Sequence, residues 1–179
     1  MERFKWLPLM AVLAWLGFVA PARAIEPEPT TTLFALTCMQ YFYTPEKLKG
    51  MMGEQHAITL EADKARFFLG GKEGDAWAVQ SSGRHYVISL RSDGICAVFA
   101  QQADTEAVQA SFEAMVSQAP APLEAYRKDG GGPNSGQVHT TSYAWHRPQD
   151  ASELLFTATT STDPQINVQA MISVGLARK

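Results

Sequence analysis

The feature that most constrains the fold is a strict alternation of apolar and polar residues near the C-terminus. Successive side chains of an extended strand point to opposite faces, so alternation over 166–177 predicts a strand with one covered face and one wet face. This pattern is typical of antiparallel sheets that are packed on one face only. The residues expected to share the covered face are Ile166, Val168, Ala170, Ile172, Val174 and Leu176.

Shorter strand and helix patterns earlier in the sequence indicate the fold class. Strands are expected over 77–80, 86–90, 95–101, 137–146 and 152–161, and the first three are separated by hairpin-type turns, one carrying Asp93-Gly94. Helices are expected from about Thr31 to Phe42, after Thr44-Pro45, over 61–69, and from Asp104 to about Gln118. The order helix–βββ–helix–βββ predicts a single α+β domain over 32–179. Its antiparallel sheet has about six strands, with helices packed mainly on one face.

The N-terminal 24 residues have the pattern of a cleavable signal peptide. Arg3 and Lys5 precede an uncharged run from Trp6 to Ala20, and Ala22-Arg23-Ala24 is a typical cleavage site. A run of about 15 residues falls short of the roughly 20 needed to cross a bilayer. We therefore expect cleavage near Ala24, a disordered leader over 25–31, and a periplasmic or secreted product without a transmembrane segment.

The charge balance argues against nucleic acid as a partner. Without residues 1–24 the chain carries 12 Lys and Arg against 17 Asp and Glu, with no basic run. Nucleic-acid binding selects clustered basic surfaces.

The two cysteines, Cys38 and Cys96, lie far apart in the sequence. In an oxidising compartment such a pair is most simply a disulfide. A redox or nucleophilic cysteine is the alternative, although no C-x-x-C pair or activating neighbour is visible.

No assembled catalytic set or metal site emerges from the motifs. The histidines do not have zinc-ligand spacing, the G-x-S-x-G pattern is absent, and no cofactor is implied. Paired carboxylates distant in sequence stay open as an alternative. The Gly-rich stretch from Gly130 to Gly136 is interpreted as a flexible connection, with a cleft beneath it if the protein binds a small molecule.

One strand concentrates the candidate binding residues. Alternation places His139, Tyr143 and Trp145 on one face and His146 on the other. An aromatic contact patch is one interpretation, because Tyr and Trp bring rigid area and a polar tip to interfaces. In the other interpretation Trp145 belongs to the core and Tyr143 lies at its rim.

Four segments carry a resemblance to known proteins: Leu36-Thr37-Cys38, Phe67–Gly71, Gly74–Trp77 and Asp93–Ala100. Together they resemble a family of small exported bacterial proteins and lipoproteins of unknown function, over about the first half of the mature chain. The resemblance implies export and the disulfide, and no activity. The chain lacks the cysteine that lipoprotein members carry at the cleavage site.

These observations favour a non-catalytic, exported domain that binds another protein of the cell envelope, as an accessory factor or as an inhibitor. The alternative is a small periplasmic enzyme or small-molecule carrier. A third hypothesis, a structural envelope subunit, predicts ordered self-assembly.

Overall fold

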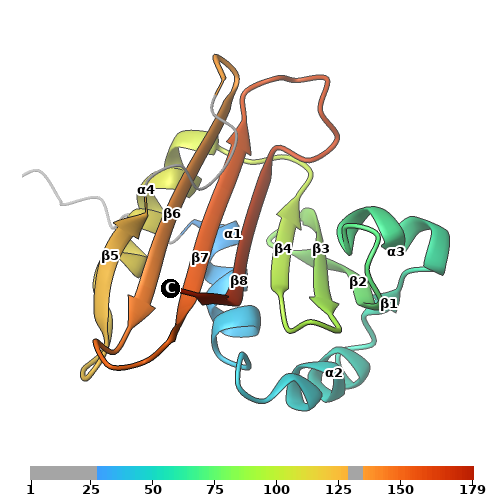
Figure 1. Cartoon of the computed structure of the whole chain (residues 1–179). Coiled ribbons are helices and arrows are strands. Elements are labelled where there is room, and N and C mark those ends of the chain that lie inside the picture. The colour runs from blue at the N-terminus through green and yellow to red at the C-terminus, as the bar shows by residue number, and fades with distance from the viewer. Residues whose placement is uncertain (1–27, 129–134) are drawn as a thin grey trace, which may run out of the picture.

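A computed structural model describes residues 28–128 and 135–179, and Figure 1 shows their arrangement. The signal peptide expected over 1–24 and most of the loop from Gly130 to Gly136 lie outside these residues. The helical segments are α1 (Pro29–Phe34), the π-helical η1 (Ala35–Met39), α2 (Pro45–Glu54), α3 (Ala62–Phe68) and α4 (Thr105–Val116). The strands are β1 (Ile58–Thr59), β2 (Gly74–Ser81), β3 (Arg84–Arg91), β4 (Cys96–Ala100), β5 (Glu124–Lys128), β6 (Val138–His146), β7 (Ser152–Ser161) and β8 (Ala170–Arg178).

The described strands form one eight-stranded sheet in the order β1-β2-β3-β4-β8-β7-β6-β5, with every neighbouring pair antiparallel. Two meanders, β2–β3–β4 and β5–β6–β7–β8, therefore meet where β4 pairs with β8. In that central pair Val98 lies opposite Ile172 and Cys96 lies opposite Val174. Helix α4 carries the chain from the centre of the sheet to its far edge (Figure 1).

One face of the sheet is packed against α1, η1, α2 and α4, and the main core lies there. Helix α4 begins at its N-cap Asp104, whose side chain accepts a hydrogen bond from the Ala107 N–H at 3.1 Å. Its apolar stripe of Val108, Phe112 and Val116 is fully buried. The residues are spaced by four, so they lie on one side of the helix and face the strands.

A disordered leader was expected over 25–31, and residues 28–31, the part that the structure describes, correct this expectation. Pro29 opens α1, and Thr30 and Thr31 are buried. The Glu28 carboxylate accepts hydrogen bonds from the Thr31 N–H at 2.7 Å and from both threonine hydroxyls at 2.9 Å. Capping of this kind satisfies the free N–H groups of a first helical turn. Residues 28–31 therefore form an ordered, capped helix start.

Within the described residues the sheet has eight strands, two more than the six expected. The two additional strands are β1, with only two residues, and β5, whose sequence Glu-Ala-Tyr-Arg-Lys lacks an apolar alternation. Both lie at the edges of the sheet, where one strand neighbour suffices and charged side chains reach water.

The last strand begins at Ala170 rather than Ile166. The Asp163 side chain accepts a hydrogen bond from the Gln165 N–H at 2.9 Å, and this turn interrupts the extended chain. The alternation is confirmed over 170–174, where Ala170, Ile172 and Val174 are buried on the core face. Leu176, expected on the same covered face, is 62% exposed.

Candidate functional site

The face of the sheet opposite the main core carries the candidate site. Strand register arranges β2, β3 and β4 into three rows on this face. The outer row contains Gln80 and His85, which pair between β2 and β3, together with Gln101, which directly follows β4. The middle row contains Ala78, Val87 and Phe99, and the inner row contains Ala76, Ser89 and Ala97. The rows change from polar at the outer end of the strands to apolar and then to small residues.

Helix α3 lies across this face and covers its inner row. Ala65 and Leu69 pack against Ala76, and the Phe68 ring lies 5.1 Å from the Phe99 ring at an interplanar angle of 72°. The helix is short because Gly70 and Gly71, both with positive φ, follow its last residues. Alone among the described helices, α3 therefore sits opposite α1, η1, α2 and α4, as the helix beside β1 and β2 in Figure 1.

Between α3 and the middle row lies a cavity of about 760 Å³, here called the α3 cleft. Its floor comes from the middle row, and its walls come from α3 and from the segment around β1. Residues spaced three and four apart in α3 share a side of the helix, which brings Lys64, Phe67 and Phe68 together. The described lining residues are Ile58, Leu60, Lys64, Phe67, Phe68, Ala78, Val79, Gln80, His85, Tyr86, Val87, Phe99, Gln101, Asn167 and Val168.

Large apolar side chains stand exposed at the rim of the α3 cleft. Ile58 is 70% exposed and Phe67 is 69% exposed, although both are large hydrophobic residues. Phe67 also lies edge-on to Phe68, with ring centroids 5.1 Å apart. Clustered apolar exposure of this kind marks binding surfaces more often than single exposed residues do.

Polar groups also line the same cleft. The outer row supplies an imidazole and two carboxamides, and the Lys64 ammonium lines the cleft from α3. The nearest acid to Lys64 is Glu61, at 3.9 Å, and both side chains are mostly exposed. Among the described lining residues there is no carboxylate and no cysteine. The described lining therefore offers hydrogen-bond donors and positive charge, and it does not offer paired carboxylates or a thiol nucleophile.

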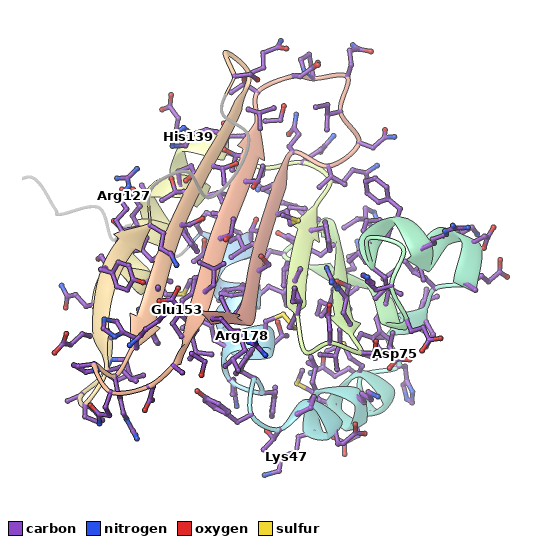
Figure 2. All side chains as sticks on the ribbon, viewed as in Figure 1. Lys47, Asp75, Arg127, His139, Glu153 and Arg178 are labelled. Carbon is purple, nitrogen blue, oxygen red and sulfur yellow. A yellow bond between two sulfur atoms is a disulfide. The ribbon has the colours of Figure 1, made fainter. Side chains whose placement is uncertain are left out.

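A second polar group, here called the Glu153 cluster, lies on the same face of the sheet at the far edge. The Glu153 carboxylate has no exposed surface, and it accepts hydrogen bonds from the Tyr126 hydroxyl and the Lys128 ammonium. Figure 2 shows Glu153 on β7, while both donors come from β5. The cluster thus ties the edge strand to β7 across the intervening β6, and both carboxylate oxygens are occupied.

The electrostatics of the Glu153 cluster follow from this pairing. Burial of Glu153 acts to raise its pKa, but the hydrogen bonds from Lys128 and Tyr126 outweigh it, and the pKa lies below the ordinary value of 4.5. The hydrogen bond to Glu153 raises the pKa of Lys128 above 10.5. The cluster is therefore a carboxylate–ammonium pair over the whole neutral range.

The predicted residues of β6 occupy different environments. Trp145 is buried, its indole N–H donates to the Val116 carbonyl at 2.7 Å, and its ring lies 4.6 Å from the Phe156 ring. Tyr143 is half-buried beside Phe112, while His139 is exposed near the top of β6 in Figure 2. The shared face of these residues is confirmed, and their role in binding stays a prediction.

The disulfide between Cys38 and Cys96 is confirmed, and it joins η1 to the first residue of β4. Both cysteines are buried, at 0% and 2% exposure, and no free cysteine occurs in the described residues. In the part of the chain that the structure describes, no group of three or more His, Cys, Asp or Glu could hold a metal ion. No described helix is long and apolar enough to cross a membrane.

The sequence did not reveal the α3 cleft. The cleft expected near the Gly130–Gly136 loop falls largely outside the described residues. The α3 cleft is built mainly from α3 and the β2–β3–β4 meander, with Asn167 and Val168 added from the β7–β8 connection. The available signal was two adjacent aromatic residues, Phe67 and Phe68, separated from a glycine pair only by Leu69. In a seven-residue helix they cover more of its circumference than one buried stripe requires.

Comparisons with known proteins identify no match to this chain. No protein-family model matches the chain, and neither the search of curated proteins nor that of solved structures gives a significant match.

Proposed function

We propose that this chain is an exported, non-catalytic binding protein that holds an apolar ligand in the α3 cleft. The observation that carries the proposal is the cleft itself, about 760 Å³ in volume and lined mostly by aliphatic and aromatic side chains. Ligand sites in proteins typically measure about 300–1,000 Å³ and combine apolar walls with a few polar groups. Export is supported by the N-terminal signal pattern and by the buried disulfide, and the N-terminal residue of the purified protein tests it.

The direct test is binding of N-phenyl-1-naphthylamine, a neutral probe whose fluorescence rises in apolar surroundings. We expect saturable binding to the full-length product, and at least about tenfold weaker binding by Ala78→Trp. Ala78 is a half-buried residue of the middle row, so an indole at this position fills the cleft.

Leu155→Trp is the matched control. Leu155 is also half-buried and lies on the same face of the sheet, on β7, outside the cleft. Its substitution by Trp should leave the dissociation constant unchanged. Equal probe binding by both variants, with circular dichroism showing that both are folded, would contradict the proposed site.

A protein partner is the second candidate, and the edge of the sheet favours it. Within the described residues β1 pairs only with Trp77 and Ala78 of β2, which leaves the Val79–Ser81 end of β2 at the edge. An extended peptide could add to such an edge and place an apolar side chain beside Phe67. A protein partner whose binding is blocked by Ala78→Trp, together with no binding of the naphthylamine probe, would favour this candidate over the small ligand.

A further inference from the structure

The α3 cleft is graded along the strand direction. Its middle row is apolar, with Val87 and Phe99 on the floor. The outer row is polar, with His85 two residues from Val87 in β3 and Gln101 two residues from Phe99, directly after β4. Asn167, just before β8, lies at the same end, because Gln169 donates to the Ala100 carbonyl at 3.0 Å. A ligand that fills the cleft therefore contacts apolar walls along its body and polar groups at one end.

The two sides of α3 line two different cavities. A smaller cavity is lined by Ala62, Ala65, Arg66 and Leu69 of this helix, whereas the α3 cleft is lined by Lys64, Phe67 and Phe68. The two cavities share only Leu60 among their described lining residues, so they lie on opposite sides of the helix. Lys64 is consequently the cation that α3 presents to the cleft.

We propose that the α3 cleft binds an anionic single-chain amphiphile, with its hydrocarbon chain over the middle row and its anionic head group beside Lys64 and His85. This inference rests on the proposed function and names the ligand class. The two ends of such a molecule match the two ends of the cleft.

The charges of the lining residues determine which head-group charge the cleft favours. Lys64 and Glu61 are 3.9 Å apart, with side chains 68% and 80% exposed, and an exposed pair of this kind is weak. Lys64 is thus available to an anion at little cost. A cationic head group would find no carboxylate among the described lining residues, and a neutral head group would gain hydrogen bonds without the charge term.

Displacement of bound N-phenyl-1-naphthylamine by three compounds with the same chain tests the inference: dodecanoate, dodecan-1-ol and dodecyltrimethylammonium. We expect dodecanoate to displace the probe at a concentration about fivefold lower than the alcohol requires, since an exposed ion pair contributes up to about 1 kcal/mol. The ammonium compound should be the weakest competitor. All measurements are made below the critical micelle concentrations, at one ionic strength.

Substitutions then test which side chains cause the preference for an anionic head group. Lys64→Gln and His85→Gln should each weaken binding of dodecanoate more than binding of the alcohol, and so reduce the preference for dodecanoate. Lys47→Gln is the control, because Lys47 is an exposed lysine on α2, away from the cleft (Figure 2).

The outcomes separate the two claims. Equal displacement by dodecanoate and dodecan-1-ol would overturn the anionic ligand and leave the apolar site standing. A preference for dodecanoate that persists in Lys64→Gln/His85→Gln would also overturn it. Absence of saturable probe binding would overturn the apolar ligand in the α3 cleft, and with it the anionic amphiphile.

Discussion

At the scale of single residues, the best-defined electrostatic feature is the buried Glu153 carboxylate. Removing a carboxylate from water is costly unless hydrogen bonds and an opposite charge replace the lost hydration. Tyr126 and Lys128 provide both, and the Lys128 side chain keeps a third of its surface in water. This pairing explains why an ionised group persists on a sheet face without destabilising it.

Replacing Glu153 by Gln should lower the free energy of unfolding by about 1–3 kcal/mol, because the charge-assisted hydrogen bonds are lost. Urea unfolding monitored by tryptophan fluorescence measures the change. The Glu153→Gln/Lys128→Met double variant should lose less than the two single changes combined, since the residues contact each other. Additive losses would contradict a direct coupling.

The same pair predicts a pH dependence. The pKa of Glu153 is lowered from 4.5 on folding, so its contribution is fully present above that value and is lost as the pH falls through the folded pKa. The pKa of Lys128 is raised from 10.5, so its contribution is present below that value and is lost at higher pH. The stability difference between wild type and Glu153→Gln should therefore stay constant at neutral pH and shrink in acid.

At the scale of elements, the connection from α3 into β2 determines the position of α3, which forms one wall of the α3 cleft. Gly70 and Gly71 end the helix, and Gly74 starts β2 with a φ of 147°. A Cβ at Gly74 would lie 2.2 Å from the Leu90 carbonyl oxygen and 2.8 Å from the Arg91 Cα. Only glycine allows β2 to approach β3 this closely directly after the turn.

Gly74→Ala should therefore destabilise the protein by at least about 2 kcal/mol through backbone strain and the clash. The matched control is Gly50→Ala, inside α2, where an added Cβ meets nothing within 4 Å. That change should stabilise by about 0.5–1 kcal/mol through helix propensity. Thermal unfolding of both variants checks the opposite signs, and a neutral Gly74→Ala would contradict the close approach.

At the scale of the whole molecule, the fold consists of two meanders joined through β4 and β8, and the disulfide adds a covalent link at that centre. Cys96 is the first residue of β4, and Cys38 holds the N-terminal helical segment against it across 58 residues of sequence. Cross-linking a loop of this length restricts the unfolded chain far more than the folded one.

Loss of the disulfide should lower the free energy of unfolding by about 4 kcal/mol. Urea unfolding of Cys38→Ala/Cys96→Ala against the oxidised protein measures it. Because both sulfurs are joined in the disulfide, thiol labelling of the unreduced protein unfolded in urea should modify neither cysteine. Labelling of both would contradict the bond.

Much of this architecture was predictable, and the misses have physical causes. The antiparallel meanders, the α4 stripe and the cysteine pair follow from local periodicity, turn residues and cysteine count. Strand β5 was missed because an edge strand need not alternate, and Ile166 was misplaced because the Asp163 turn competes with strand pairing. The α3 cleft was missed because its walls come from segments with no shared pattern.

The sequence by itself determined the class of fold, since the side-chain period and the hairpin turns depend only on neighbouring residues. Tertiary structure alone decided that β4 pairs with β8, that α3 lies on the face opposite the other helices, and that Phe68 meets Phe99. These are contacts between distant segments, and each is selected by how well whole surfaces pack. The cleft between α3 and the middle row exists only once that packing is complete.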